Sequence, residues 1–404
     1  MKRIVLKFGG TSVGSIKKIQ NVAKIIKKRH DDKNEIIIVV SAMSGTTNDL
    51  VKKSELISSN FDKKELDVLL SSGEQISSSL LSAAIIELGI KARSWLNWQI
   101  PIITDNKHNA SQIINVQTKE ILKFISNGGV AVIPGFQGIS SESRTTTLGR
   151  GGSDLSAVVI AKFFNSDTCE IYTDVDGVLT TDPSITKKAK KIEKISYEEM
   201  LEMASLGAKV MQPSAVQASM IDNIPIHVRS TFSEKSGTKI VSEADIDYKK
   251  VITGIAYSKN NAKVSIIGVI DKPGVAADIF EPIGRNNINI DMVIQNTSLD
   301  GKTANITFTI KQEDLKKTLN IIEKNKQKIN YEKITHDEKL AKVSVVGAGM
   351  IASPGVTHKM FRSLADEKIN ILAISTSEIK ISVLVQQDLT QKAVKILHEA
   401  FKLN

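Results

Sequence analysis

The sequence of 404 residues contains a single cysteine, Cys169, so no disulfide bond can form within the chain. Such a low cysteine content is typical of a reducing compartment. No stretch approaches the roughly 18–20 apolar residues that a membrane-spanning helix needs. The amino-terminal residues do not resemble a signal peptide, because Lys7 interrupts their apolar run. We therefore expect a cytoplasmic protein.

Aromatic residues make up only 4% of the sequence, which leaves few side chains to stack on nucleic-acid bases. The formal net charge of +10 would by itself allow a nucleic-acid partner. The lysines, however, alternate with apolar residues in stretches such as 17–30 and 313–328, a pattern typical of solvated helix faces. We expect neither a nucleic-acid nor a membrane partner, although the positive field would attract an anionic nucleotide.

The first 245 residues alternate short apolar runs with amphipathic stretches. The runs, at 3–8, 35–42, 129–136, 169–175 and 225–230, are rich in β-branched residues. Strands that are buried on both faces have this composition, and they belong to mainly parallel sheets. The amphipathic stretches, at 15–29, 74–89 and 153–164, predict helices between the strands. This alternation predicts a layered α/β domain with ligands at the carboxyl ends of the strands.

From about residue 249 an internal repeat replaces this pattern. The tripeptide Pro-Gly-Val occurs at 273–275 and again at 354–356, each time followed by a phenylalanine and an Asn-Ile pair. Each copy predicts a strand, a loop, a helix and a strand, with the proline at the first position of the helix. Two copies are too few for a solenoid and indicate paired small domains. The polar segment 242–250 is the predicted boundary.

Four loops of the first half place small residues directly after a predicted strand. In the first loop, Gly9 and Gly10 follow Lys7 and precede a helix. Glycines let the backbone approach a phosphate, a helix N-terminus adds positive potential, and Lys7 can reach the same anion. The loop is not a Walker A motif. Taken alone, a Gly-Gly turn before a helix is more often structural than functional.

The other three loops contain further polar side chains at strand ends. The second offers Ser41 and Thr47, and the fourth offers Thr173 and Asp174. The third loop, 145–154, ends in Ser153 and Asp154, either of which could cap the helix that follows. Its arginine and paired glycines exceed what a plain helix start needs, so we interpret this loop as functional.

Two charged residues lie on or beside helices. Glu74 is expected at the start of a helix, where a carboxylate also stabilises the helix dipole. Lys209 is expected in a turn of small residues before Pro213, where an ordinary exposed lysine is the simpler alternative.

The segments KFGGTSVG, SAMSGTTN, SSGEQ, GFQG, TLGRGGSD, YTDVDGV and GAKV occur in this order. In this order they resemble the motifs of aspartokinases in the amino-acid kinase superfamily. The paired Pro-Gly-Val units resemble the tandem ACT domains of the same enzymes, so the resemblance covers essentially the whole chain. It implies a three-layer α/β kinase domain at 1–245, with a central mainly parallel sheet. Two α+β ferredoxin-like ACT domains follow at 249–404, the first at about 262–335 and the second at about 251–261 plus 340–404.

The resemblance also implies roles for individual residues. The expected catalytic residues are Lys7, Asp154 and Lys209. The expected contacts to ATP are Lys7, Phe8, Gly9, Gly10, Thr173, Asp174, Leu179, Ser184, Lys209 and Val210. The expected contacts to aspartate are Ser41, Thr47, Glu74, Phe136, Thr147, Arg150 and Ser153. The expected contacts to a regulatory amino acid are Asp271, Gly274, Val275, Ala276, Asn289, Ile290, Gln295, Val356, Thr357, Asn370 and Ile371.

The implied reaction transfers the γ-phosphoryl group of ATP to the β-carboxylate of L-aspartate, the first step toward lysine, threonine, methionine and diaminopimelate. A side-chain carboxylate with a pKa of about 3.9 is already a nucleophile at neutral pH, so no general base is needed. Mg²⁺ is expected to bind through the phosphates rather than through protein ligands. Lysine, threonine or both are the expected effectors, and a homodimer or larger oligomer is expected to form through the ACT domains.

Three residues or segments depart from the family pattern. Leu179 stands where a tyrosine is common, Ser184 where an arginine is common, and Gln212-Pro213-Ser214 where His-Pro-Arg is common. We expect the first two to change the affinity for ATP rather than abolish activity.

Several other interpretations remain open at this point. A related kinase acting on glutamate, acetylglutamate, carbamate or UMP is the nearest alternative, and a catalytically silent amino-acid sensor is another. The ACT pair could also serve dimerisation alone. Residues 345–352 match a dinucleotide-binding fingerprint, but Pro354 lies where its helix should run, which argues against that interpretation.

Overall fold

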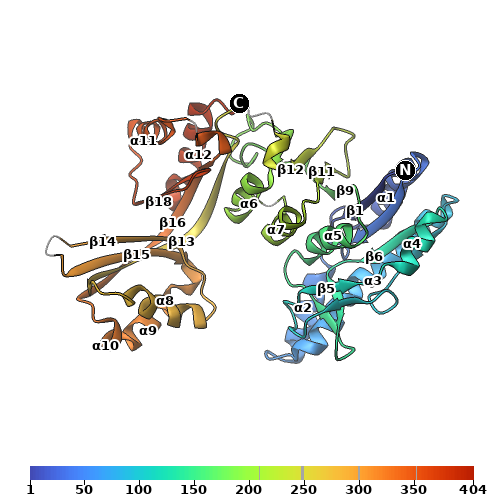
Figure 1. Cartoon of the computed structure of the whole chain (residues 1–404), viewed down its shortest axis with the longest axis horizontal. Helices are drawn as coiled ribbons and strands as arrows, with labels where there is room; N and C mark the ends of the chain where they lie inside the picture. Colours follow the sequence, from blue (N-terminus) through green and yellow to red (C-terminus); the bar gives the residue numbers. More distant parts are fainter. Residues whose placement is uncertain (209, 247–249, 299–300, 352) are drawn as a thin grey trace. The chain divides into compact units, whose positions relative to one another are not determined.

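The computed structural model describes residues 1–208, 210–246, 250–298, 301–351 and 353–404 (Figure 1). These residues form two compact units. The first contains residues 1–179, 191–205 and 210–246, and the second contains 180–190, 206–208 and the described residues from 250 onward. Two short segments from the first 245 residues, 180–190 and 206–208, therefore pack with the second unit.

The first unit is built on an eight-stranded sheet with the order β10-β12-β11-β9-β1-β2-β6-β3. Its strands are β1 (Arg3–Phe8), β2 (Glu35–Val40), β3 (Ala92–Ser94), β6 (Val130–Pro134), β9 (Thr168–Thr173), β10 (Lys194–Ser196), β11 (Ile226–Ser230) and β12 (Thr238–Val241). Only the β11–β12 pair is antiparallel among the described pairs. All five apolar runs of the sequence lie in this sheet, which confirms the mainly parallel α/β prediction.

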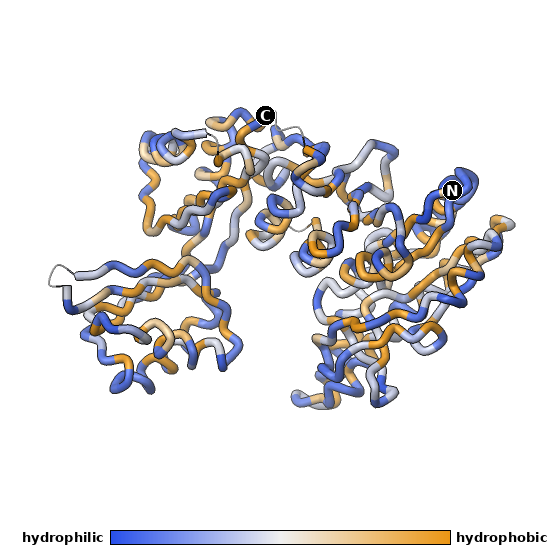
Figure 2. The backbone as a smooth tube through the Cα atoms, in the orientation of Figure 1, coloured by the Kyte–Doolittle hydropathy of each residue, from blue (hydrophilic) through white to orange (hydrophobic). Residues whose placement is uncertain are grey.

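Helices cover both faces of this sheet. On one face, α1 (Ile16–Asp31) and α3 (Lys63–Glu87) share a core with Leu6 and Ile38 of the strands. On the other face, α5 (Gly152–Phe163) packs on β1, β2 and β9. The unit also contains α2 (Thr46–Ile57), α4 (Lys119–Ser126), α6 (Tyr197–Ser205) and α7 (Pro213–Asp222). Figure 2 shows hydrophobic residues concentrated along the strands and hydrophilic residues along the outer helices and loops.

A smaller four-stranded sheet lies in the same unit, with the order β5-β4-β7-β8. Its strands are β4 (Ile102–Thr104), β5 (Ile113–Val116), β7 (Gln137–Ser140) and β8 (Thr145–Thr147). β8 leads directly into the loop that precedes α5, so this sheet positions one wall of the site described below.

Helix α3 begins much earlier than the sequence suggested. Asp62 caps it, because its carboxylate accepts the backbone N–H groups of Lys64 and Glu65. Gly73 therefore lies inside the helix, where a Cβ atom would come 2.9 Å from the Cβ of Ala42. The glycine permits close packing rather than a helix start. The expectation that Glu74 opens a helix and stabilises its dipole is wrong, because Glu74 lies near the middle of α3.

The second unit is built on a six-stranded antiparallel sheet with the order β14-β15-β13-β16-β18-β17. Its strands are β13 (Gly254–Ile270), β14 (Asp291–Thr297), β15 (Thr303–Lys311), β16 (Lys333–Val346), β17 (Ala373–Thr376) and β18 (Lys380–Gln386). The long strands β13 and β16 are shared by both repeats: residues 254–258 pair with 342–346, and residues 263–267 pair with 333–337.

Each repeat covers its half of this sheet with its own helices and core. The first uses α8 (Val275–Arg285), α9 (Leu315–Lys324) and α10 (Lys326–Ile329), and the second uses α11 (Val356–Asp366) and α12 (Thr390–Ala400). This arrangement confirms two α+β ACT units. The described residues of 345–352, which do not include Ala352, also do not form a dinucleotide-binding fold, because every described strand pair around them is antiparallel.

The sequence predicted that the repeated prolines occupy the first position of each helix, and this prediction is wrong. The N-cap residues are Gly274 and Gly355, with φ angles of 94° and 100°, and the helices begin one residue later. This left-handed conformation favours glycine, so the glycine of each Pro-Gly-Val sets the helix start. The preceding Pro273 and Pro354 lie outside the helices.

The described helices include none that is both long and apolar enough to cross a membrane.

Candidate active site

Three loops converge at one edge of the large sheet. β1 is parallel to β2, and β2 is parallel to β6, so their carboxyl ends lie side by side. The loops after these strands line a cavity of about 790 Å³. Ten residues expected at the site line it: Lys7, Gly10, Ser41, Thr47, Glu74, Phe136, Thr147, Arg150, Ser153 and Asp154.

The first two loops are in close contact at Gly10. The carbonyl oxygen of Gly10 accepts the backbone N–H of Ser44 at 3.2 Å. A Cβ atom on Gly10 would lie 2.8 Å from the carbonyl oxygen of Ala42, a separation that real side chains do not show. At Gly9 the nearest atoms would be 3.5 Å and 3.6 Å away, which is ordinary contact. Gly10, rather than Gly9, is therefore the residue on which this loop contact depends.

Lys7 and Asp154, which both line the cavity, form an ion pair. The Nζ of Lys7 lies 2.5 Å from Oδ1 of Asp154, and each side chain is 11% exposed. Asp154 lies in the first turn of α5, whose N-cap is Gly151 with a φ angle of 76°. The expectation that Ser153 or Asp154 caps this helix is wrong. Both residues follow the cap, and both line the cavity.

Two helix N-termini also face the cavity. α2 begins after Gly45, which has a φ angle of 91°, and α5 begins after Gly151. Because glycine has no side chain, neither helix start is capped by a side-chain hydrogen bond. The backbone N–H groups of a first helical turn have no partner within the helix and favour anions. Together with Lys7, they make this part of the cavity suitable for phosphate groups.

Glu74 brings a negative charge into the same cavity. It is 4% exposed, and its Oε1 accepts the backbone N–H of Ala42 at 3.0 Å. Burial raises the pKa of the Glu74 carboxyl to about 7, and the hydrogen bond from Ala42 opposes this shift. Its Oε2 is buried without a hydrogen-bond partner among the described residues. A buried oxygen of this kind favours a ligand with N–H donors.

Arg150 provides a positive charge in the loop before α5. Its side chain is exposed and lines the cavity. Within the described part of the chain, its guanidinium group forms no ion pair. It is therefore available for bidentate binding of a carboxylate.

Phe136 follows β6 with a φ angle of 71°, which is unusual for a residue with a side chain. Its backbone N–H donates to Oγ of Ser156, and its carbonyl oxygen accepts the N–H of Leu148. These bonds hold the residue in this conformation at the cavity wall, as is common for strained residues of functional sites.

Several expected ATP contacts do not line this cavity. Phe8 is fully buried and stacks on Tyr172 at 4.7 Å between ring centroids, so only its backbone could contact a ligand. Thr173 and Asp174 lie at the same sheet edge, because the N–H of Gly9 donates to the carbonyl oxygen of Tyr172. Leu179 bridges to Lys191, and Val210 precedes α7. Ser184 belongs to the second unit, and Lys209 lies outside the described residues.

The cavity wall also contains polar residues that sequence reasoning did not assign. They are Ser44, Asn48, Asn109 and Gln212. In the sequence, Gln212 stands out only as part of a segment that departs from the family pattern. Its side chain packs over Gly151, where a Cβ atom would lie 1.9 Å from the Cγ of Gln212. The turn-rich segment around Asn109 was a usable signal, because asparagine tolerates the left-handed conformation found there, with a φ angle of 63°.

The expected effector contacts lie at equivalent places in the two repeats of the second unit. Gly274 and Val275 lie at the start of α8, and Val356 and Thr357 lie at the start of α11. Asn289 and Ile290 precede β14, and Asn370 and Ile371 precede β17. Gln295 lies in β14, an outer strand of the sheet.

No group of three or more His, Cys, Asp or Glu side chains suitable for a metal ion occurs among the described residues. In the cavity, the Asp154 carboxylate is paired with Lys7. With this carboxylate already paired, a Mg²⁺ ion at the site would depend on phosphate and water ligands.

Comparisons with known proteins agree with this architecture. Residues 2–230 match the amino acid kinase family, and residues 264–325 and 343–401 match the ACT domain. The aspartate kinase of Pseudomonas putida is 44% identical over 405 residues, which cover 100% of this chain and 98% of that protein.

Solved structures show the same fold. Escherichia coli aspartokinase III in complex with aspartate and ADP, in its R state, matches with a TM-score of 0.83 at 23% identity. Its complex with lysine and aspartate, in the T state, matches with a TM-score of 0.76 at 23% identity. Both matches cover 99% of this chain and 100% of the solved chain.

The fold and the cavity thus define an amino acid kinase with a tandem ACT region. Within this class, the chain belongs to the aspartokinase family and is an enzyme of that family.

The contact between Gly10 and Ala42 gives a prediction about stability. Gly10→Ala should destabilise the protein by about 1–3 kcal/mol, the usual cost of overpacking, because the second loop must move away. The matched Gly9→Ala variant should differ little from the unaltered chain. Thermal unfolding of the three proteins measures both effects. Equal unfolding temperatures for the two variants would contradict this description of the loop contact.

Proposed function

We propose that this chain transfers the γ-phosphoryl group of ATP to the β-carboxylate of L-aspartate, giving 4-phospho-L-aspartate and ADP. The observation that carries the proposal is the buried Oε2 of Glu74, which has no hydrogen-bond partner among the described residues. The same cavity contains Lys7 and also Arg150, which forms no ion pair with any described residue. Such a cavity offers a partner for each charged end of an amino acid beside a phosphate-binding surface. The solved E. coli relative that contains aspartate and ADP supports this choice of ligands.

The charges of aspartate determine how it would bind. Arg150 binds the α-carboxylate with two parallel hydrogen bonds, and Glu74 accepts from the α-ammonium group. Ser41, Thr47, Phe136, Thr147 and Ser153 complete the pocket. With both α-substituents held, the β-carboxylate faces the phosphate-binding end of the cavity. It needs no general base, because it is ionised at neutral pH.

The main barrier to the reaction is electrostatic, because an anion must approach a polyanion. Phosphoryl transfer is catalysed largely by positioning and by stabilising the charge of the transferring group. Lys7 supplies positive charge there, and Asp154 holds its ammonium group in place. The N-termini of α2 and α5 add backbone donors. Mg²⁺, bound through the phosphates, would neutralise further charge, and Lys209 is proposed as a second lysine.

The nucleotide would extend along the same sheet edge from Gly9 and Gly10 toward Thr173 and Asp174. Phe8 would contribute through its backbone, and Leu179, Ser184 and Val210 complete the proposed contacts. Leu179 and Ser184 lack the ring and the charge that are common at these places, so we expect a changed affinity for ATP.

The second unit is proposed to regulate the first. Lysine, threonine or both would bind near the starts of α8 and α11, and the solved E. coli T-state structure with lysine supports this idea. β14 and β17 are the outer strands of the described sheet, so they could pair with a second copy in a homodimer or larger oligomer.

We further propose that 1–245 is the catalytic domain, that 249–404 is the regulatory region, and that the protein acts in the cytoplasm.

Trapping of the acyl phosphate tests the function directly. Purified protein with MgATP, aspartate and hydroxylamine should form the aspartyl hydroxamate and equal amounts of ADP. Glutamate, acetylglutamate, carbamate and UMP should give no comparable turnover. Turnover with one of these instead would assign another kinase activity, and no turnover with any substrate would favour a silent amino-acid sensor.

Arg150→Ala tests the proposed orientation of the substrate. Loss of the bidentate charge pair, about 2 kcal/mol or more, should raise the KM for aspartate at least ~10-fold. The KM for ATP should stay within about twofold. Arg144→Ala is a matched control, because this nearby arginine pairs with Glu65 and does not line the cavity. Steady-state kinetics that show an unchanged aspartate KM in Arg150→Ala would refute the assignment.

Glu74 makes aspartate binding dependent on pH. With a pKa of about 7, the free carboxyl is about half protonated at pH 7, and pairing with an ammonium group favours the ionised form. Aspartate binding should therefore release roughly half a proton at pH 7 and almost none at pH 8.5. Its affinity should fall as the pH decreases below 7.

Calorimetric titration of aspartate in two buffers with different ionisation enthalpies measures this release. Glu74→Gln should abolish the release and weaken binding. An equal heat of binding in both buffers at pH 7 would show that Glu74 does not change its protonation state.

A further inference from the structure

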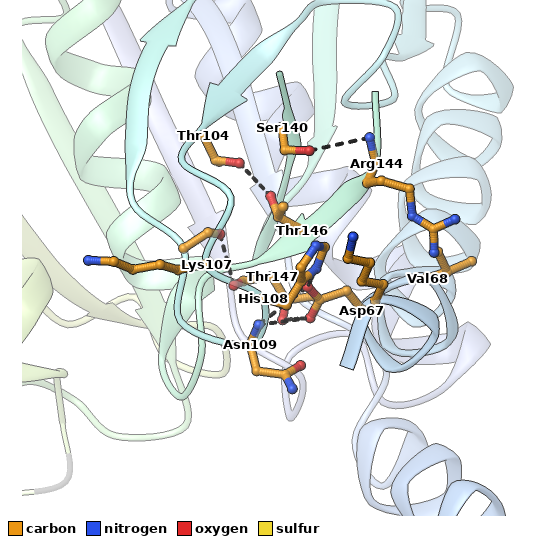
Figure 3. Close-up of polar contacts among 12 residues, drawn as sticks. Asp67, Val68, Thr104, Lys107, His108, Asn109, Ser140, Arg144, Thr146 and Thr147 are labelled. Carbon is orange, nitrogen blue, oxygen red and sulfur yellow. Dashed lines mark hydrogen bonds and ion pairs between the residues drawn. The ribbon is translucent and has the colours of Figure 1, made fainter. Parts of the chain in front are cut away.

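Asp67 is a fully buried carboxylate beside the cavity, near the start of α3 (Figure 3). It accepts four hydrogen bonds from three residues. Nδ1 of His108 donates at 2.6 Å, the backbone N–H of Asn109 donates to both oxygens at 3.2 Å and 3.3 Å, and Oγ1 of Thr147 donates at 2.5 Å. Asp67 and His108 do not line the cavity, whereas Asn109 and Thr147 do.

This arrangement fixes the polarity of the Thr147 hydroxyl group. A hydroxyl has one hydrogen to donate and two lone pairs with which to accept. Thr147, which is 1% exposed, directs its hydrogen to Asp67. Toward the cavity, the same oxygen can therefore act only as an acceptor.

Asp67 also fixes the backbone of Asn109. The two hydrogen bonds to its N–H hold Asn109 in a left-handed conformation, with a φ angle of 63°. The side-chain Oδ1 of Asn109 is buried and has no hydrogen-bond partner among the described residues. Asn109 is thus a second cavity residue that offers an unused acceptor oxygen.

Three residues that line the cavity thus carry an acceptor oxygen that receives no hydrogen bond from the described part of the protein: Glu74 Oε2, Thr147 Oγ1 and Asn109 Oδ1. An ammonium group has three N–H donors and no acceptor. A carboxylate or phosphate, by contrast, would leave all three oxygens unsatisfied and would be repelled by Glu74. The wall therefore matches the one cationic group of an amino-acid substrate.

We propose that Asp67, held by His108, positions Thr147 and Asn109 as acceptors for the α-ammonium group of the amino-acid substrate. This inference rests on the proposed function. Asn109 becomes a substrate-binding residue, and Asp67 and His108 become positioning residues that act through Asn109 and Thr147. The network also ties the loop between β4 and β5 to α3, across 41 residues of sequence.

The network should affect recognition of the ammonium group and leave the carboxylates unaffected. Asp67→Asn keeps the shape of the side chain but introduces an amide hydrogen where an acceptor is needed. We expect it to raise the KM for aspartate about 10-fold, the effect of losing about 1.4 kcal/mol. The KM for ATP should stay within about twofold. Inhibition by succinate, which has both carboxylates but no ammonium group, should be unchanged within about twofold.

A double-mutant cycle tests whether Asp67 acts through Thr147. In a Thr147→Val background, which lacks the hydroxyl group, Asp67→Asn should change the aspartate KM clearly less than it does alone. Thr146→Val is a matched control, because its buried hydroxyl group bonds to Thr104 at 2.6 Å and does not line the cavity (Figure 3). This variant should leave both KM values within about twofold of those of the unaltered chain, whatever its unfolding temperature.

His108 variants give a second route if Asp67→Asn does not fold. His108→Ala removes one donor and should raise the aspartate KM severalfold. His108→Asn, whose amide can occupy the place of Nδ1, should restore it toward the original value.

The outcomes separate the inference from the proposed function. Three results would overturn the inference alone, provided that the unaltered chain turns over aspartate. The first is that Asp67→Asn weakens the binding of aspartate and of succinate equally. The second is that Asp67→Asn and Thr147→Val act independently on the aspartate KM, and the third is that Asp67→Asn and His108→Ala leave it unchanged. No aspartate turnover by the unaltered chain overturns the proposed function and, with it, the inference.

Discussion

The parallel pairing of β1 with β2 and β9 is the constraint on which the site depends. It places the carboxyl ends of these strands at one edge of a buried sheet, so the loops that follow them must meet there. Gly10 then brings two of these loops into direct contact, and the glycine caps of α2 and α5 direct helix N-termini into the same cavity. The apolar strand residues thus determine the fold, and they also determine where Lys7 and the helix N-termini come together.

The cavity separates charges that would otherwise neutralise one another. Lys7 is paired with Asp154 at one part of the wall. Glu74, in contrast, is buried without an ion pair to any described residue, and burial raises its pKa to about 7. A phosphate group therefore binds favourably near Lys7, and an ammonium group binds favourably near Glu74. An amino acid with a second carboxylate can satisfy the acidic residue and Arg150 together and still present an anion to the transferring phosphoryl group. The proposed chemistry follows from this separation of charge, because phosphoryl transfer needs positioning and charge stabilisation more than acid–base catalysis.

The sequence was sufficient where the signal is local. The five apolar runs became central strands, and three of the four small-residue loops became parts of the cavity wall. The sequence was insufficient where contacts between residues far apart in the chain determine the local structure. Gly73 reads as a helix break, but it is needed for packing against Ala42, and the caps are glycines rather than the neighbouring Pro, Ser or Asp. His108 and Thr147 lie 41 and 80 residues after Asp67 in the sequence, so no local pattern could reveal the network that joins them. Phe8 belongs to a recognisable motif, yet its ring lies in the core.

A crystal structure of the chain with aspartate and a non-hydrolysable ATP analogue tests the central claim most directly. The account predicts the terminal phosphate beside Lys7 and the N-termini of α2 and α5. It also predicts the α-carboxylate on Arg150 and the α-ammonium group on Glu74. A triphosphate bound away from Lys7, or an aspartate whose ammonium group does not contact Glu74, would contradict it.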